Sequence, residues 1–405
     1  MSAPVLKERE EFYRIKRLPP YVFAEVNKLK AELRAQGRDI IDFGFGNPDL
    51  PTPQHVIDKL IETVQKPRVT GYSASKGIKG LRQACARYYD RRFGVDLDPD
   101  TQVIATIGSK EGFANLAQAI TAPGDVIYAP DPSYPLHAYG FIIAGAKIKG
   151  IPAITAEEYL TGVKRALEED PEPPMAIVVC FPSNPTGMTC DLGFYEEIVA
   201  LAKALDIIVL SDLAYSEIYF GEPPHSIFEV PGASEILAIE TTSLSKTYSM
   251  AGWRMGFAVG HETLIAALTR VKSYLDYGAF TPIQVAACAA LDGPQDPVEH
   301  ARAMYRARRD VMVSSFARAG WTIPSPEASM FAWAPLPEAY RSMGSLAFSK
   351  YLMENADVAV SPGNGFGEHG EGYVRIALVE NEQRIRQAAR NIGRMISRDA
   401  ANAAE

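Results

Sequence analysis

Short apolar runs alternate with longer segments of mixed character along most of the chain. Residues 126–129, 176–181 and 207–210 are continuous apolar runs of the length expected for strands buried on both faces of a sheet. The segments between them predict helices, for example at residues 54–65 and 78–93. This alternation indicates an α/β domain with a mostly parallel sheet.

The pattern changes in the last third of the chain. Residues 302–319 predict a long charged helix, and apolar runs at 331–333 and 358–360 flank a helix at 346–355. Strands and helices that do not alternate regularly are typical of a smaller α+β unit. We therefore expect a second, smaller unit after the α/β domain.

Composition narrows the class of protein. The 405 residues are 47% hydrophobic and 22% charged, which is ample for a globular core. A net charge of −8 argues against a nucleic-acid partner and against a basic membrane-binding face. No apolar run approaches the roughly 18 residues that cross a bilayer, and residues 1–20 lack the apolar core of a signal peptide. We expect a cytoplasmic protein with no membrane partner.

Cysteine and histidine spacing gives no support for a metal site. The four cysteines form no C-x-x-C pair, and the six histidines include no H-E-x-x-H pattern. We expect the cysteines to be reduced structural thiols and predict no metal ligands.

The segment 243–257 carries the most specific chemistry in the chain. Lys246 lies among small hydroxyl residues that include Ser243 and Ser245, and Arg254 follows eight positions later. Arginine binds phosphate oxygens in a bidentate manner and hydroxyls donate to the remaining ones, so the segment predicts a dianion site. A lysine beside a bound phosphate group is placed to form a Schiff base with an aldehyde of the same ligand.

Three further motifs follow predicted strands. The turn at residues 108–112 exposes backbone N–H groups at the start of a helix, which favours an anion near Ser109 and Lys110. Asn184 lies in an Asn-Pro-Thr-Gly turn at the carboxyl end of a buried strand, where open α/β sheets bind ligands. Asp212 ends the next buried strand, and a carboxylate there needs a positive partner.

These motifs, in this order and followed by Arg375, resemble those of the class I/II aminotransferases of fold type I, which depend on pyridoxal phosphate. The resemblance covers residues 18–392 and implies a large α/β domain with a mixed, mostly parallel seven-stranded sheet and a small α+β domain. We expect the large domain over residues 50–290 and the small domain over residues 1–49 and 291–405, with an N-terminal arm. The family also implies a homodimer with shared active sites.

The resemblance assigns a role to each motif residue. Lys246 carries the cofactor and is the general base, and Asp212 and Tyr215 serve the cofactor ring. The residues expected to bind the cofactor besides these three are Ser109, Lys110, Tyr134, Asn184, Ser243, Ser245, Arg254 and, from the other subunit, Tyr72. The residues expected at the substrate are Arg375, which takes the α-carboxylate, Gly46, Asn184 and Tyr21. His137 either supports Asp212 from behind or is a structural histidine.

Substrate choice is less constrained. Residues 18–23, 251–254 and 276–278 look most like bacterial glutamate–pyruvate (alanine) transaminases, which predicts transfer between L-alanine and 2-oxoglutarate. No arginine occurs between Ser273 and His300, so the extra arginine of one group of aspartate enzymes is missing. Aminotransferases for LL-diaminopimelate, aspartate, methionine or aromatic acids are the alternatives of the same class.

Two functions of other kinds share the fold. Lyases of the family release their product without an amino acceptor, and this behaviour separates them from transaminases. Some transcription regulators use the fold as a ligand sensor behind an N-terminal helix-turn-helix. The twenty residues before Tyr21 are too few for that motif, which argues against a regulator.

Overall fold

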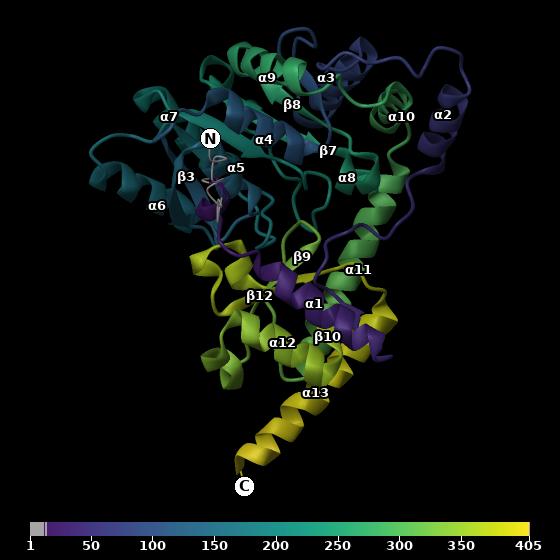
Figure 1. Cartoon of the computed structure of the whole chain (residues 1–405), viewed down its shortest axis with the longest axis vertical. Helices are drawn as coiled ribbons and strands as arrows, with labels where there is room; N and C mark the ends of the chain where they lie inside the picture. The colour runs from purple at the N-terminus through teal and green to yellow at the C-terminus, as the bar shows by residue number, and fades with distance from the viewer. Residues whose placement is uncertain (1–11, 13, 405) are drawn as a thin grey trace, which may run out of the picture.

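The computed structural model describes residue 12 and residues 14–404. The upper part of the molecule in Figure 1 is built on one sheet of seven strands in the order β2-β8-β7-β6-β5-β3-β4. Only β8 is antiparallel to its neighbours, and the other pairs are parallel. The strands are β2 (Val103–Thr106), β3 (Val126–Asp131), β4 (Lys147–Pro152), β5 (Ala176–Val179), β6 (Ile208–Asp212), β7 (Ala238–Ser243) and β8 (Gly256–Gly260). The predicted mixed, mostly parallel seven-stranded sheet is confirmed.

Helices cover both faces of this sheet because successive strand residues point to opposite sides. On one face, Ile127 and Leu210 pack with α4 (Ser109–Ile120), α5 (Leu136–Ala144) and α9 (Glu262–Leu275). On the other, Tyr128 and Val209 pack with α6 (Ala156–Glu169) and α7 (Leu192–Leu205). The antiparallel edge is covered on that side by α2 (Gln54–Val64), α3 (Lys79–Phe93) and α10 (Thr281–Asp292).

The lower part of the molecule contains segments from both ends of the chain (Figure 1). Its helices are α1 (Val22–Ala35), α12 (Ser345–Ala356) and α13 (Glu382–Ala404), and α11 (Asp296–Arg318) runs down to it from the large sheet. Strand β1 (Ile41–Asp42) pairs in parallel with β10 (Val358–Ala359). Strands β11 (Ser361–Pro362), β12 (Tyr373–Ala377) and β9 (Phe331–Pro335) form an antiparallel sheet in that order.

One hydrophobic cluster extends through this lower part and joins Ile41 near one end of the chain to Met395 near the other. The same cluster includes Tyr215 and Phe220, which follow β6 of the large sheet. The boundaries predicted at residues 50 and 290 stay a prediction.

The remaining helical segments are short, with three to six residues each. They are α8 (Leu244–Thr247), η1 (Ile15–Arg17), η2 (Ile227–Glu229), η3 (Ala233–Glu235), η4 (Ala251–Trp253), η5 (Glu338–Met343), η6 (Gly363–Phe366) and η7 (Glu368–Gly370). Among the described residues, no helix is both long enough and apolar enough to cross a membrane.

Candidate active site

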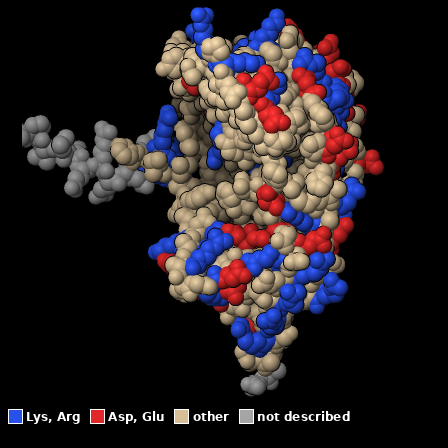
Figure 2. All heavy atoms as spheres, turned by 90° about the vertical axis from the view of Figure 1, so that its right-hand side faces the viewer, with Lys and Arg blue, Asp and Glu red and all other residues tan. Residues whose placement is uncertain are grey.

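A cavity of about 590 Å³ lies where the two parts of the molecule meet. In the space-filling view a hollow opens at this level between the upper and the lower part (Figure 2). The cavity is lined by turns at the carboxyl ends of β5, β6 and β7, by α1 and by residues of the lower sheet. All the predicted site residues line it except Tyr72, so the structure brings together Tyr21, Gly46, Ser109, Lys110, Tyr134, Asn184, Asp212, Tyr215, Ser243, Ser245, Lys246, Arg254 and Arg375.

Lys246 enters the cavity from the single-turn helix that follows β7. The side chain of Ser243 caps this turn by accepting from the Ser245 N–H at 3.1 Å. The Lys246 amine donates to the Gly46 carbonyl oxygen at 2.6 Å. Burial, together with the positive charges of Arg375 and Arg254, lowers the pKa of Lys246 to about 8. A substantial neutral fraction near physiological pH makes the amine a usable nucleophile and base.

Groups that bind anions gather next to this lysine. The guanidinium of Arg254 lies so close to Gly108 that a Cβ there would be 2.2 Å from Nη2. Gly108 directly precedes α4, whose N-terminal residue Ser109 lines the cavity with Ser243. Arg254 forms no ion pair with a carboxylate among the described residues. Its Nη1 donates to the Ala251 carbonyl at 2.8 Å. A guanidinium without a carboxylate partner, serine hydroxyls and a helix N-terminus together suit a phosphate dianion.

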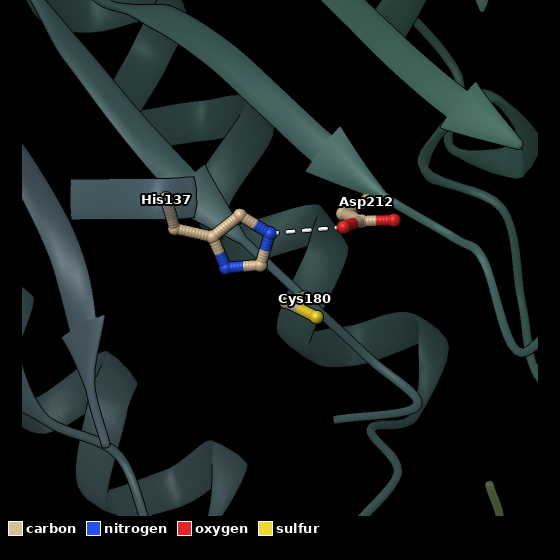
Figure 3. Close-up of side chains that lie close together, drawn as sticks. All are labelled: His137, Cys180 and Asp212. Carbon is tan, nitrogen blue, oxygen red and sulfur yellow. Dashed lines mark hydrogen bonds and ion pairs between the residues drawn. The ribbon is translucent and has the colours of Figure 1, made fainter. Parts of the chain in front are cut away.

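Asp212 lies at the end of β6, and His137 and Cys180 lie next to it (Figure 3). His137 Nε2 is 2.9 Å from the Asp212 carboxylate. A carboxylate oxygen can only accept a hydrogen bond, so Nε2 carries the proton. The potential ligand atoms of the three residues lie within 4.8 Å of one another. Burial raises the pKa of the Cys180 thiol well above its usual value, which disfavours the thiolate that a metal ion would need as a ligand. Of the two interpretations of His137, the structure favours support for Asp212.

Arg375 projects from β12 and is fully enclosed. It donates through Nη1 to Asn184 Oδ1 at 2.9 Å and through Nη2 to the Gly44 carbonyl at 3.1 Å. Its guanidinium carbon lies 4.0 Å from the ring centre of Phe331 and 4.7 Å from that of Phe366. Burial lowers its pKa to about 10, and Nε is buried without a hydrogen-bond partner. A buried cation that lacks a carboxylate partner among the described residues is a strong binding site for an anionic group.

Tyr72 is the one predicted site residue outside the cavity. It is 89% exposed, and its ring centre is 4.7 Å from that of Tyr277. Among the described residues it does not line the cavity that the other predicted site residues share.

Sequence comparison covers nearly the whole chain. Residues 38–392 match the family model for aminotransferase class I and II. This chain is a class I/II aminotransferase.

The aminotransferase is similar to named relatives over their full length. It is 62% identical to AatC of Rhizobium meliloti (strain 1021), a protein named only provisionally as an aminotransferase, with 96% of each chain covered. It is 49% identical to the glutamate-pyruvate aminotransferase AlaC of Escherichia coli (strain K12), with 97% of this chain and 95% of AlaC covered. It is 42% identical to the LL-diaminopimelate aminotransferase of Moorella thermoacetica, with 96% and 99% covered.

Solved structures agree with this assignment. The substrate-bound structure of BacF from Bacillus subtilis superposes with a TM-score of 0.89 at 34% identity, over 95% of this chain and 98% of BacF. Membership of the family implies pyridoxal phosphate as the cofactor. The residues that line the cavity also fit this cofactor, because the anion site at Arg254, the buried amine of Lys246 and the carboxylate of Asp212 surround one space.

Sequence patterns did not single out several residues that line the aminotransferase cavity. Phe331 and Phe366 pack against Arg375, and Lys30 and Asp42 form an ion pair at 2.7 Å in the wall of the cavity. Aromatic residues in a strand are typical of a core, and a lysine on an amphipathic helix is typical of a solvated face. Only the three-dimensional pairing of distant segments reveals their position.

Proposed function

We propose that this aminotransferase transfers the amino group between L-alanine and 2-oxoglutarate, giving pyruvate and L-glutamate. The observation that carries the proposal is the pairing of two buried cations around one cavity. Lys246 supplies an amine with a pKa of about 8, and Arg375 supplies a guanidinium with an unused donor. An α-amino acid presents an amine and a carboxylate on adjacent carbons, so it matches a site with a reactive amine and a carboxylate receptor.

The anion-binding groups and Asp212 are proposed to hold the cofactor. In this assignment Arg254, Ser109, Ser243 and Ser245 would hold the phosphate, and Asp212 would pair with the ring nitrogen. His137 donates to Asp212 and thereby keeps its carboxylate oriented. Tyr134 is assigned to the face of the ring, and Tyr215 and Asn184 to its phenolic oxygen. Pyridoxal phosphate supplies the electron-withdrawing ring that acidifies the substrate Cα–H.

Lys246 is the proposed general base. Its amine takes the Cα proton of the substrate, and its lowered pKa supports this role because a base works best when its pKa is near the working pH. Arg375 fixes the α-carboxylate and so orients the Cα–H bond toward the amine. Gly46 and Tyr21 form the adjoining wall of the cavity.

An acceptor such as 2-oxoglutarate brings a second carboxylate. Of the cations around the cavity, Lys30 is paired with Asp42, and Lys246, Arg254 and Arg375 are already assigned. Lys110 remains, and its ammonium nitrogen is 5.7 Å from the ring centre of Tyr134. We assign the side chain of Lys110 to the distal carboxylate and its backbone to the phosphate region. This supports a dicarboxylate substrate without the arginine that residues 273–300 lack.

LL-diaminopimelate is the second candidate substrate. The similarity to several LL-diaminopimelate aminotransferases at 39–42% identity favours it. The higher identity to AlaC, at 49%, is the reason to place alanine first.

A second copy of the chain is the proposed partner. Large apolar side chains at the end of α9 and the start of α10 are exposed together with Tyr72, and they are Tyr274, Leu275, Tyr277 and Phe280. An exposed apolar group of this size is typical of an interface between subunits. In the dimer, Tyr72 is assigned to the cofactor phosphate of the other subunit.

The test is the visible spectrum of the enzyme with bound pyridoxal phosphate, recorded while single amino acids are added without an acceptor. We expect L-alanine and L-glutamate each to bleach the visible band, and pyruvate or 2-oxoglutarate to restore it. If only LL-diaminopimelate bleaches the band, the alanine assignment is wrong and the second candidate holds. A lyase would instead release its product without losing the band.

A further inference from the structure

A short loop links the two cations that we assign to the substrate. The carbonyl of Gly46 accepts from Lys246 at 2.6 Å, and the carbonyl of Gly44 accepts from Arg375 at 3.1 Å. The loop of residues 44–46 therefore contacts the amine of Lys246 at one end and the guanidinium of Arg375 at the other.

Gly44 is fixed at both of its peptide groups. Its N–H donates to Asp42 Oδ1 at 3.0 Å. Its carbonyl accepts from Ser361 Oγ at 2.6 Å as well as from Arg375. Ser361 lies directly opposite Arg375 in the pairing of β11 with β12, so it reaches the same carbonyl from the neighbouring strand. One of the hydrogen bonds that orient Arg375 thus ends on a carbonyl whose own position is held by Asp42 and Ser361.

Asp42 is in turn held by helix α1. Lys30 donates to Asp42 Oδ2 at 2.7 Å, and Arg34 lies 3.5 Å from the same oxygen. The side chains of Lys30 and Asp42 are only 13% and 18% exposed, so solvent screens the pair weakly. The two cations also neutralise a carboxylate that lines the cavity and would otherwise repel an anionic substrate.

We propose that Asp42 is a positioning residue for substrate binding. Its carboxylate, held by Lys30, fixes Gly44 so that the guanidinium of Arg375 meets the α-carboxylate of the substrate. This inference rests on the proposed function, because it takes Arg375 as the α-carboxylate receptor. Asp42 lines the cavity, and its proposed role acts through Gly44 and Arg375.

The test compares steady-state constants of cofactor-loaded variants. Asp42→Ala removes the acceptor for the Gly44 N–H and is expected to raise KM about tenfold for the amino donor and for the 2-oxo acid alike. Asp42→Asn keeps an oxygen that accepts from Gly44 and is expected to restore most of the loss. Cofactor content, measured from the visible band, should stay at the wild-type level in both variants. A merely structural role would lower the melting temperature and leave KM unchanged.

A second test changes Lys30 instead of Asp42 and asks whether the charge of the Asp42 carboxylate affects substrate binding. Lys30→Met leaves the Asp42 carboxylate with only the more distant and more exposed Arg34 beside an anion site, and we expect KM to rise for both substrates. In the double variant, Asp42→Asn removes that charge and should bring KM back toward the wild-type value. Asp39→Ala is the matched control, since it breaks the exposed pair between Asp39 and Arg384 in the same segment and should leave KM unchanged.

Arg375→Lys separates this inference from the proposed function. If it raises KM while Asp42→Ala and Lys30→Met leave KM within about twofold of wild type, the role of Asp42 is wrong and Arg375 keeps its assignment. If Arg375→Lys also leaves KM unchanged, Arg375 does not bind the α-carboxylate. The proposed function then falls, and the role of Asp42 falls with it.

Discussion

The backbone of Gly108 lies against the guanidinium of Arg254, and a Cβ at position 108 would be 2.2 Å from Nη2. Gly108 also has φ of +75°, a conformation that side chains rarely adopt. Because both residues belong to the anion site, a side chain here would displace the cation assigned to the cofactor phosphate.

We therefore expect Gly108→Ala to weaken pyridoxal phosphate binding by at least about tenfold, measured by equilibrium titration of the cofactor-free protein. Gly94→Ala is the matched control, because Gly94 has φ of +66° but a Cβ at that position would have no heavy atom within 4 Å. It should cost about 1 kcal/mol of folding stability and leave cofactor affinity unchanged. Equal cofactor affinity in the two variants would contradict the phosphate role of Arg254.

The parts of the fold that depend on local sequence were predictable. The apolar runs gave the strands of the large sheet because their hydrophobicity is continuous and turns bound them. The helix predicted at residues 302–319 begins earlier, at Asp296, because Pro297 occupies its first turn, where proline is tolerated. Pro297 was the sequence signal that could have placed the start of this helix correctly.

The site was predictable only where its motif is contiguous. Ser243, Lys246 and Arg254 belong to one segment and lie together in the cavity. The bond from Arg375 to Gly44 joins residues 331 positions apart, and no local pattern encodes it. Helix α1 likewise reads as a surface helix, although Lys30 turns inward to Asp42. Long-range pairing decides these contacts, so they became visible only in the folded structure.

The lowered pKa of Lys246 gives the cofactor-free protein a testable pH dependence. Only the neutral amine reacts with acetic anhydride, so labelling of Lys246 should rise with pH around a midpoint of about 8. At pH 7 about one amine in ten is then neutral, against about one in three thousand for an ordinary lysine. Peptide-resolved mass spectrometry measures the midpoint.

The charge of Arg375 is one cause of that shift, which supplies a control. Arg375→Met should move the labelling midpoint of Lys246 to higher pH, because it removes a positive charge that disfavours the protonated amine. Arg375→Lys keeps the charge and should leave the midpoint near that of the wild type. A midpoint near the ordinary lysine value in the wild-type protein would contradict the buried, cation-flanked position of Lys246.

Glu240 on β7 predicts a pH dependence of stability that is separate from catalysis. Its carboxyl is fully buried, and it accepts from Tyr89, Ser211 and Ser226 without a cationic partner among the described residues. Burial raises its pKa. The folded state therefore binds this proton more tightly than the unfolded state, and the stabilisation present at low pH is lost as the pH rises through the raised pKa.

Glu240→Gln stays neutral at every pH and should therefore gain more free energy of unfolding over the wild type at pH 8 than at pH 4, which lies below the ordinary carboxyl pKa of 4.5. Urea denaturation at the two pH values measures the difference. The control is Glu235→Gln, because Glu235 is exposed and its pKa is lowered by Lys203, so no gain is expected there at pH 8. An equal gain at both pH values would show that packing, rather than charge, decides the effect of Glu240.

A variant of Lys110 distinguishes two roles of its side chain, which are binding of the cofactor phosphate and binding of the distal carboxylate of the substrate. If its side chain binds the distal carboxylate, Lys110→Met should raise KM for 2-oxoglutarate about tenfold or more and change KM for pyruvate little. Cofactor affinity should stay near that of the wild type. A variant that loses cofactor affinity with an equal effect on both acceptors would instead place the ammonium at the phosphate.

The exposed position of Tyr72 makes the shared-site dimer testable by mixing inactive chains. Tyr72→Ala and Lys246→Ala are each expected to have low activity as pure proteins. In a mixed dimer with shared sites, one site receives Lys246 from the first chain and Tyr72 from the second, and both residues are intact. Unfolding and refolding a mixture of the two variants should therefore restore a substantial fraction of wild-type activity.

If Tyr72 served its own chain, each chain in the mixed dimer would keep its defect and activity would stay at the sum of the separate variants. Tyr274→Ala, which removes a side chain that is 82% exposed in the same apolar group, is the control that should alter dimer stability without being rescued by mixing with Lys246→Ala.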